Sequence, residues 1–266
     1  MGSNLAQKIC TNQNFVIGLD KEPNKNFTSD KFYICNILDI NKLSISDLNL
    51  DTIVHLAAEH RDDVEPSNLY YETNYQGTKE VVKFAEKNNI NKIIFTSSVA
   101  VYGINLNNSS EDDSPNPFNH YGKSKLMAEE VLNKWYIKNK KRTLVIIRPT
   151  VIFGPGNKGN VHNLINQIKN KKFLMIGKGQ NMKSLAYIDN FTNFIVELLN
   201  ISSGKFIYNY SDKPDLKIND LINQIYKSLN MKRTKFHLNQ KIGLLGGFFI
   251  DLLSRLTNRQ FSVRYT

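Results

Sequence analysis

The chain has 266 residues, of which 41% are hydrophobic, and a formal net charge of +11. This length suits one large domain or two smaller ones, each with its own core. Two cysteines exclude a disulfide framework, the N-terminus lacks the apolar core of a signal peptide, and no apolar run reaches the length of a membrane span (about 18 residues), so we expect a cytoplasmic protein.

Short runs rich in valine and isoleucine alternate with helical patterns through the first part of the chain. Continuous apolar strands separated by helices are typical of a parallel sheet that is buried on both faces. We therefore predict an α/β fold with a Rossmann-like, doubly wound parallel sheet in a domain over residues 1–150. The predicted strands are 15–19, 31–34, 52–57, 92–97 and 143–147, and the predicted helices are 67–87 and 121–138.

Beyond residue 150 the pattern is less regular. Helical segments at 161–169, 190–199 and 218–229 are separated by loops that contain glycine and proline. This predicts a smaller substrate-binding region over residues 151–266.

The start of the chain differs from the usual opening of a dinucleotide-binding sheet, which is a strand followed by a glycine-rich turn. The segment Met1-Gly2-Ser3 is similar to the last glycine of such a turn, followed by its helix, although it is equally consistent with an expression remnant. We therefore expect the first region to be truncated, with the first strand of the sheet missing. We expect the second region to be truncated as well.

Tyr121 and Lys125 are four residues apart in a predicted helix and therefore lie on one face of it. A free tyrosine titrates near pH ~10, and a nearby ammonium favours its phenolate form. Ser98 follows the strand that precedes this helix. A strand-end serine combined with a Tyr–Lys pair predicts a proton-transfer site. The alternatives are an exposed helix pair for Tyr121 and Lys125, and a simple cap for Ser98.

Four longer stretches carry a resemblance to a known family: 55–64 (HLAAEHRDDV), 116–125 (NPFNHYGKSK), 148–154 (RPTVIFG) and 183–187 (KSLAY). With them the chain resembles the extended short-chain dehydrogenases/reductases, in particular the NAD-dependent sugar epimerases and dehydratases. Within that family, the stretches are most similar to epimerases that act on N-acetylglucosamine carried by polyprenyl diphosphate.

The resemblance implies a 4-epimerase of a diphosphate-linked N-acetylhexosamine that uses NAD and works through a transient 4-keto sugar. In that chemistry Tyr121 is the base for the sugar 4-hydroxyl, Lys125 lowers the pKa of Tyr121 and binds the nicotinamide ribose, and Ser98 bonds the same hydroxyl. No metal is expected. The implied cofactor residues are Gly2, Asp20, Asn36, Ile37, Ala57, Ala58, Asn74, Tyr121, Lys125 and Pro149. The implied substrate residues are His60, Arg61, Ser98, Asn160, Val161 and Lys183.

Asp20, at the end of the second expected strand, favours NAD over NADP. A carboxylate there accepts hydrogen bonds from ribose hydroxyls and repels a 2′-phosphate. Asn36 stands where the family usually has aspartate, so it keeps an acceptor oxygen for adenine binding but loses the charge.

Three other functions remain open at this point. One is epimerisation of a soluble sugar linked to uridine diphosphate, and another is an inactive remnant that lacks the glycine-rich turn. A 4,6-dehydratase is disfavoured, because that reaction needs an Asp-Glu pair beside the serine and Ser98 is followed by Val99-Ala100.

The expected partners are the sugar substrate and, by family analogy, a second copy of the chain, with no nucleic acid. Residues 201–266 hold eleven Lys/Arg against four Asp/Glu. The apolar stripe at 242–256 therefore has two interpretations: core packing, or a surface for the inner face of the membrane, with Lys241, Arg255 and Arg259 facing lipid phosphates.

Overall fold

The computed structural model describes residues 1–11, 14–23, 28–45, 49–61, 64–104, 109–157 and 159–233, and the backbone of 237–238. The stripe at 242–256, its basic neighbours and the stretch 62–63 lie outside the described residues. The chain divides into two compact units. Unit 1 comprises Met1–Asn157 and Leu185–Asp212, and unit 2 comprises Lys158–Ser184 and Lys213–Thr266. The expected ranges 1–150 and 151–266 do not coincide with these units, because residues 185–212 return to unit 1.

The centre of unit 1 is a four-stranded sheet of order β3-β4-β5-β9 in which all neighbouring strands are parallel. A separate two-stranded parallel sheet is formed by β1 and β2. In the part of the chain that the structure describes, no ladder joins β1 to β3. The strands are β1 (Ile17–Asp20), β2 (Lys31–Ile34), β3 (Thr52–His55), β4 (Lys92–Thr96), β5 (Thr143–Pro149) and β9 (Gly204–Tyr210).

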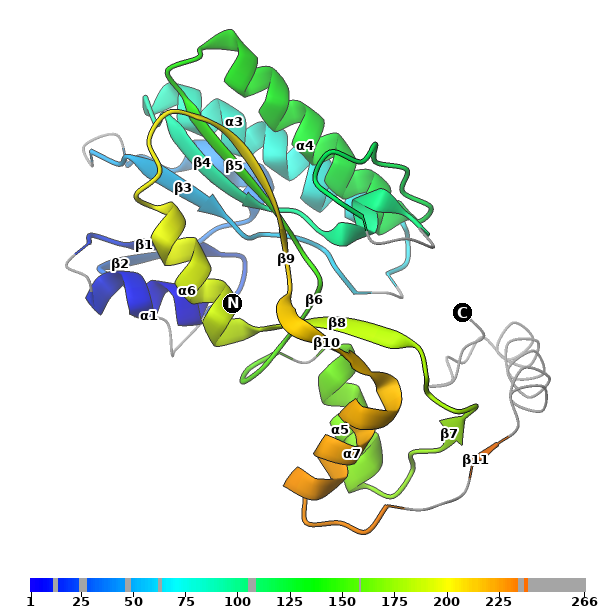
Figure 1. Cartoon of the computed structure of the whole chain (residues 1–266). Helices are drawn as coiled ribbons and strands as arrows, with labels where there is room; N and C mark the ends of the chain where they lie inside the picture. Colours follow the sequence, from blue (N-terminus) through cyan, green and yellow to red (C-terminus); the bar gives the residue numbers. More distant parts are fainter. Residues whose placement is uncertain are drawn as a thin grey trace. The chain divides into compact units, whose positions relative to one another are not determined.

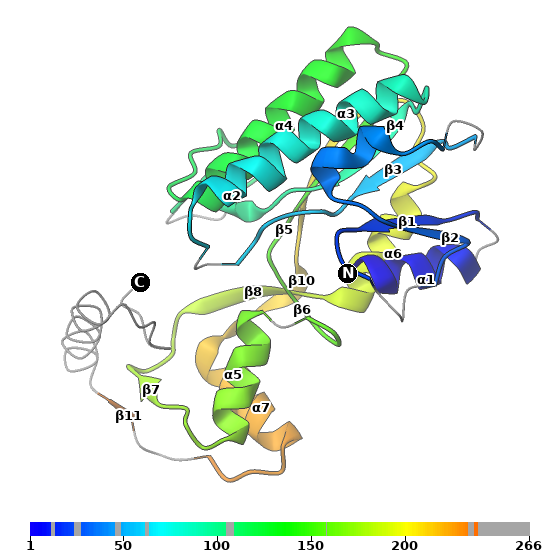
Figure 2. The same ribbon diagram turned by 180° about the vertical axis from the view of Figure 1, so that it is seen from behind.

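Helices cover both faces of the four-stranded sheet, as Figures 1 and 2 show: α3 and α4 lie on one side, and α1 and α6 on the other. The predicted doubly wound α/β fold is therefore confirmed. The helices of unit 1 are α1 (Gly2–Thr11), α2 (Asn68–Tyr70), α3 (Gly77–Lys87), α4 (His120–Lys138) and α6 (Ile188–Leu198). Shorter helical turns are η1 (Ile37–Lys42), η2 (Tyr71–Gln76) and η3 (Val99–Tyr102).

The two cores follow from the alternation of side chains along β4. Ile93 and Phe95 point to the α3/α4 face, where they pack with residues such as Trp135, whereas Ile94 points to the α1/α6 face and packs with residues such as Phe191. Successive strand residues face opposite sides, so a strand buried on both faces is apolar at every position. This explains why β4 and β5 read as continuous apolar runs in the sequence.

Unit 2 contains helices α5 (Asn160–Lys169) and α7 (Ile218–Ser228), which contact one another. The short strands β7 (Met175–Ile176) and β11 (His237–Leu238) pair in parallel. A small three-stranded sheet has the order β10-β8-β6, and two of its strands contain residues of both units. They are β8 (Met182–Tyr187) and β10 (Asp212–Lys217), and the third strand is β6 (Val151–Phe153).

Candidate active site

Three neighbouring strands of the sheet end at one edge. β3 ends at His55, β4 at Thr96 and β5 at Pro149, which is buried. In open parallel sheets, ligands bind outside the carboxyl ends of the strands. The small residues Ala57, which is exposed, and Ala58 follow β3, and Ser98 follows β4. The predicted site residues Ala57, Ala58, Ser98 and Pro149 therefore all lie at this edge.

Ser98 stands at the junction between β4 and the short helix η3. Its backbone is extended (φ −164°, ψ 150°), and its Oγ accepts a hydrogen bond of 3.2 Å from the N–H of Ala100. A hydroxyl has a second lone pair and a proton. Ser98 is half-buried, so its hydroxyl can still bond a ligand while it caps the helix.

Helix α4 begins against the η3 turn that Ser98 caps. The side chain of Asn119 caps α4 by accepting the N–H of Gly122 at 2.8 Å. A Cβ added at Gly122 would lie 2.4 Å from the backbone oxygen of Ala100. Glycine at this position thus allows the first turn of α4, which carries Tyr121, to approach the Ser98 segment closely.

Replacing Gly122 with alanine is expected to separate these two elements. Alanine gains up to about 1 kcal/mol in helix propensity, but the clash with a backbone oxygen costs about 1–3 kcal/mol, so the fold is weakened on balance. We expect kcat to fall by about tenfold or more, since small displacements of reacting groups are costly. Thermal unfolding and turnover are compared with a Lys123→Ala control at the adjacent exposed position. Wild-type kcat in Gly122→Ala would contradict the packing argument.

Tyr121 is the second residue of α4 and is half-buried. Its ring lies 6.2 Å from the ring of Tyr70, centroid to centroid, at 55°. The preceding residue, His120, shares a hydrogen bond of 2.9 Å with the hydroxyl of Tyr71. Tyr70, the last residue of α2, and Tyr71, the first residue of η2, thus pack against the start of α4 at Tyr121 and His120.

Lys125 is almost completely buried, with 1% of its surface exposed, and its Nζ lies 4.1 Å from the centre of the Phe95 ring. Burial lowers the pKa of Lys125 to about 7, although the nearby charge of Glu129 opposes this shift. His55 packs against the same phenylalanine, with the centroids of the His55 and Phe95 rings 5.2 Å apart. Burial, assisted by the charge of Lys125, lowers the pKa of His55 to about 3, so His55 is neutral at physiological pH.

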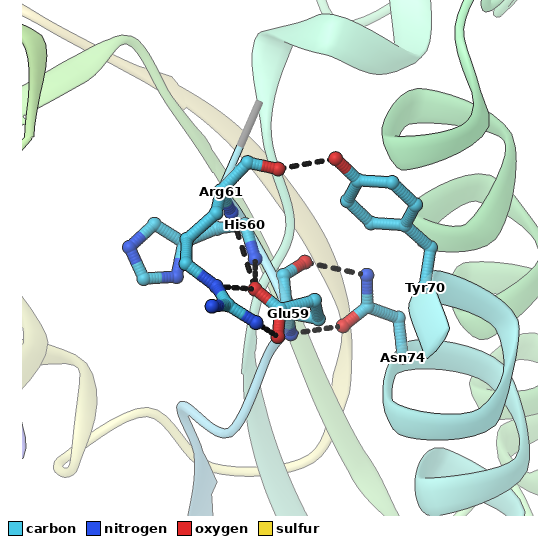
Figure 3. A network of polar contacts seen from close by, with 5 residues as sticks. All are labelled: Glu59, His60, Arg61, Tyr70 and Asn74. Atoms are coloured by element: carbon cyan, nitrogen blue, oxygen red, sulfur yellow. Dashed lines mark hydrogen bonds and ion pairs between the residues drawn. The ribbon is translucent and has the colours of Figure 1, made fainter. Parts of the chain in front are cut away.

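Asn74 connects the loop after β3 to α4, as Figure 3 shows for its contacts with Glu59. Its Oδ1 accepts the N–H of Glu59 at 2.8 Å, and its Nδ2 donates to the carbonyl of Glu59 at 3.0 Å. Nδ2 also donates to Oγ of Ser124 at 2.9 Å, and Ser124 donates to the carbonyl of Tyr121 at 2.8 Å. Asn74 is buried in the π-helical turn η2, a type of turn that often marks functional sites. These contacts give Asn74 a positioning role.

The loop after β3 is further closed by an ion pair between Glu59 and Arg61. The carboxylate accepts hydrogen bonds from Nε of Arg61 at 3.0 Å and from Nη2 at 2.8 Å, and the N–H of His60 adds a third at 3.1 Å. The hydroxyl of Tyr70 donates to the carbonyl of Arg61. In Figure 3 the imidazole of His60 points away from this network. Chiefly through the hydrogen bond from Arg61, the pKa of Glu59 is lowered to about 2.

Glu59 was not among the residues predicted from the sequence. The signal available was its place in the stretch HLAAEHR, but its role depends on Asn74, which lies fifteen residues away.

The predicted adenosine-side residues lie on the β1/β2 side of unit 1. Asp20 ends β1 with an exposed carboxylate that accepts the N–H of Glu22 at 3.1 Å. Gly2 is the first residue of α1, and Asn36 caps η1 by accepting the N–H of Leu38 at 3.1 Å. Ile37 packs against Gly77, where an added Cβ would lie 2.8 Å from its Cγ2. Asn36 is therefore engaged as a cap, with a second lone pair left for a ligand.

Three predicted substrate residues belong to unit 2. Asn160 and Val161 open helix α5, and Lys183 lies in β8 and is half-buried. All the other predicted site residues belong to unit 1.

The residues at the sheet edge fit a dinucleotide. The ammonium of Lys125 is largely buried over the ring of Phe95, where a ribose hydroxyl would give it a hydrogen-bond acceptor. Ala57 and Ala58 leave room for a ligand to cross the strand end, and the Asp20 carboxylate offers acceptor oxygens for a second ribose. Among the described residues, no group of three or more His, Cys, Asp or Glu side chains could hold a metal ion. No described helix is long and apolar enough to span a bilayer.

This fold, with serine, tyrosine and buried lysine at the carboxyl edge of the sheet, defines a dinucleotide-binding protein of the short-chain dehydrogenase/reductase type. Residues 1–210 match the NAD dependent epimerase/dehydratase family. The chain belongs to this family.

Named relatives and solved structures agree with this assignment. The chain is 49% identical to N-acetyl-alpha-D-glucosaminyl-diphospho-ditrans,octacis-undecaprenol 4-epimerase of Escherichia coli O157:H7 over 247 aligned residues. The aligned region covers 92% of this chain and 74% of that protein. It is 29% identical to UDP-glucose 4-epimerase of Vibrio cholerae, over 86% of this chain and 73% of the relative. The crystal structure of UDP-glucuronic acid 4-epimerase from Bacillus cereus with NAD superposes with a TM-score of 0.76 and 27% identity, covering 90% of this chain and 84% of the other.

Proposed function

We propose that this chain is an NAD-dependent 4-epimerase of an N-acetylhexosamine carried on a diphosphate, with polyprenol as the carrier. The observation that carries the proposal is the 49% identity over 92% of the chain to an undecaprenyl-diphosphate-linked N-acetylglucosamine 4-epimerase. The reaction interconverts the gluco and galacto configurations at C4. Its product would serve the assembly of cell-surface polysaccharide such as O-antigen.

The side chains at the sheet edge supply the groups that this chemistry needs. Bound NAD supplies a hydride acceptor that returns the hydride, so no second substrate is consumed. Tyr121 takes the proton of the sugar 4-hydroxyl and later gives it back, and Lys125 lowers the pKa of Tyr121. Ser98 donates a hydrogen bond to the oxygen that becomes the 4-keto group.

The cofactor would be held by residues from several elements of unit 1. Asp20 accepts the adenosine ribose hydroxyls, and Asn36 and Ile37 contact the adenine. Gly2 opens the helix that faces the pyrophosphate. Lys125 would donate to the nicotinamide ribose and Pro149 would contact the nicotinamide, while Asn74 holds the loop that carries Ala57 and Ala58.

We expect His60 and Arg61 to contact the substrate, and the family resemblance implies the same role for Asn160, Val161 and Lys183. Cationic side chains suit a diphosphate, and an arginine can bond it through two N–H groups at once. The ion pair with Glu59 restricts where the guanidinium of Arg61 can point. We expect this restriction to orient Arg61 for the sugar or the diphosphate.

The second candidate is a 4-epimerase of a soluble uridine-diphosphate sugar. It is supported by the 29% identity to a UDP-glucose 4-epimerase and by the likeness to a UDP-glucuronic acid 4-epimerase. Both candidates use the same side chains for proton and hydride transfer, so the carrier attached to the diphosphate distinguishes them.

Product analysis with the purified chain and NAD decides between the two carriers. N-acetylglucosamine is offered on undecaprenyl diphosphate and, in a parallel reaction, on uridine diphosphate, and the C4 epimer is measured by chromatography. We expect epimer from the lipid-linked substrate and at least tenfold less kcat/KM with the nucleotide-linked one. The reverse order would replace the first candidate by the second, and no product from either would refute the epimerase proposal.

Two finer properties accompany the lipid-linked substrate. We infer a homodimer, and a peripheral contact with the inner face of the cytoplasmic membrane that brings the chain close to its substrate. Light scattering measures the mass of the assembly, and co-sedimentation with anionic vesicles measures the contact. A monomeric mass would contradict the first inference, and a chain that stays in the supernatant would contradict the second.

A further inference from the structure

A second polar network lies directly behind the catalytic side chains. Glu129 in α4 and Arg148 in β5 form a buried ion pair: Nε of Arg148 donates to Oε1 at 3.1 Å, and Nη2 to Oε2 at 2.6 Å. Only 2% of Glu129 and 3% of Arg148 is exposed. The hydroxyl of Ser97 donates a third hydrogen bond to Oε1 of Glu129. One carboxylate thus joins the end of β4, the middle of α4 and the end of β5.

The network continues to the last strand of the sheet. Nη1 of Arg148 donates to the hydroxyl of Tyr102 at 2.7 Å, and that hydroxyl donates to Oδ1 of Asn209 at 2.8 Å. Tyr102 is the last residue of η3 and Ser98 is the N-cap of that turn. Asn209 lies near the end of β9. The segment that carries Ser98 is therefore tied to the network at both ends, through Ser97 and through Tyr102.

Stability alone is a poor explanation for this arrangement. Desolvation of two charges offsets most of their attraction, and replacing a buried ion pair by apolar residues of similar volume is often neutral or stabilising. What the pair provides is geometry, because a bidentate Arg–carboxylate contact has a fixed orientation.

Glu129 also lies on the face of α4 that carries Tyr121 and Lys125. Tyr121, Lys125 and Glu129 follow each other at intervals of four residues, which places them on one face of the helix. Glu129 is one turn beyond Lys125 and favours the charged form of that amine. The structure places two uncharged groups at Lys125, the ring of Phe95 in β4 and the buried His55 in β3, while Arg148 in β5 is paired with Glu129.

We propose that Glu129 is a positioning residue of the active site: through Ser97 and Arg148 it holds the Ser98 segment against α4, and its carboxylate, one turn beyond Lys125 on the same helix face, favours the charged form of that amine. The kinetic part of this proposal rests on the proposed epimerase function. The structural part, which concerns Glu129 and Lys125 alone, does not.

The charge on Lys125 is measured directly by NMR on the full chain with ¹³C-labelled lysine, the Lys125 resonance being assigned through Lys125→Arg. In the wild type the titration midpoint is expected at about 7. Glu129→Gln removes the anion but keeps the shape, so the midpoint is expected about one to two pH units lower. Glu130→Gln, at the adjacent exposed position, is the matched control and leaves the midpoint unchanged.

Kinetics separate positioning from charge. Ser97→Ala removes only the hydrogen bond to the strand end, so we expect kcat to fall several-fold while KM and the Lys125 midpoint stay at wild-type values. Glu129→Asp keeps the charge on a shorter arm that cannot reach both Ser97 and Arg148. It is expected to lower kcat with a near wild-type midpoint, and it serves if Glu129→Gln does not fold.

The outcomes are distinct. If Glu129→Gln leaves the midpoint and the pH profile of kcat unchanged and lowers only the melting temperature, Glu129 is structural and the proposal is wrong. If Glu129→Gln does not fold and Glu129→Asp keeps wild-type kcat, the proposal is also wrong. If the wild-type chain epimerises neither substrate, the proposed function fails, and the NMR titration still decides whether Glu129 controls the charge of Lys125.

Discussion

Replacing Tyr121 with phenylalanine is expected to abolish turnover, with kcat reduced by about 10³-fold or more, because the change removes the hydroxyl that we propose as the base for the sugar proton. The ring itself is kept, so its packing against Tyr70 and the fold are expected to persist. Epimer formation under saturating NAD and substrate measures the loss, and unchanged KM would show that the deleted hydroxyl acts in the chemical step.

A control for this change lies on the same helix. Tyr136 is half-buried near the other end of α4, with Lys140 over its ring. Tyr136→Phe removes an equivalent hydroxyl far along the helix and is expected to leave kcat unchanged. Full activity in Tyr121→Phe would refute the assignment of the base.

Replacing Lys125 with methionine is expected to abolish turnover and, at the same time, to stabilise the protein. Methionine fills similar volume without a charge that must be buried. Since burial lowers the pKa of this amine from 10.5 to about 7, removing the amine is expected to raise the free energy of unfolding by a few kcal/mol near neutral pH. The cation–π contact with Phe95 that is lost contributes only about 1 kcal/mol, so the gain from burial is larger.

The stabilisation is expected to depend on pH with a defined sign. Below pH 7 the wild-type amine is charged in both states and the folded protein carries the full cost of burying it. Between pH 7 and 10.5 the unfolded state binds the proton and the folded state does not, so the wild type becomes more stable as pH rises. The gain in melting temperature of Lys125→Met should therefore be largest at pH 6 and smaller at pH 9. An equal or smaller gain at pH 6 would contradict the burial of a cation.

Most of the central fold could be predicted from the sequence because its signals are local. The continuous apolar runs at β4 and β5 identify strands buried on both faces, and the predicted helix 121–138 differs from α4 by one residue. The strands that were missed lack such a signal. No residue of β9 or β10 is fully buried, β6 has only three residues, and β8 has two buried residues, so their pairing depends on contacts distant in sequence. The predicted helix 67–87 contains a π-helical turn that sequence periodicity does not reveal.

The residues of the candidate site also fall into those that could be predicted from the sequence and those that could not. Ser98, Tyr121 and Lys125 could be identified because their chemistry and spacing are both visible in one short stretch. The burial of Lys125 could not be predicted, because it depends on packing against Phe95, which is distant in sequence. The clamp of Asn74 on Glu59 and the pair Glu129–Arg148 were likewise hidden, since their partners come together only when strand ends and helices meet.

The return of the chain to unit 1 has a consequence for how the protein is made. Strand β9 and helix α6 are supplied by residues 185–212, after the whole first segment of unit 2 has been synthesised. Until β9 and α6 emerge from the ribosome, Phe191 and Ile195 cannot cover the sheet. Ile94, Val145 and Ile147 then form an exposed, aggregation-prone apolar surface on the nascent chain. A fragment ending at residue 157 would keep that surface permanently and is expected to aggregate, so the catalytic half cannot be isolated by a single cut in the gene.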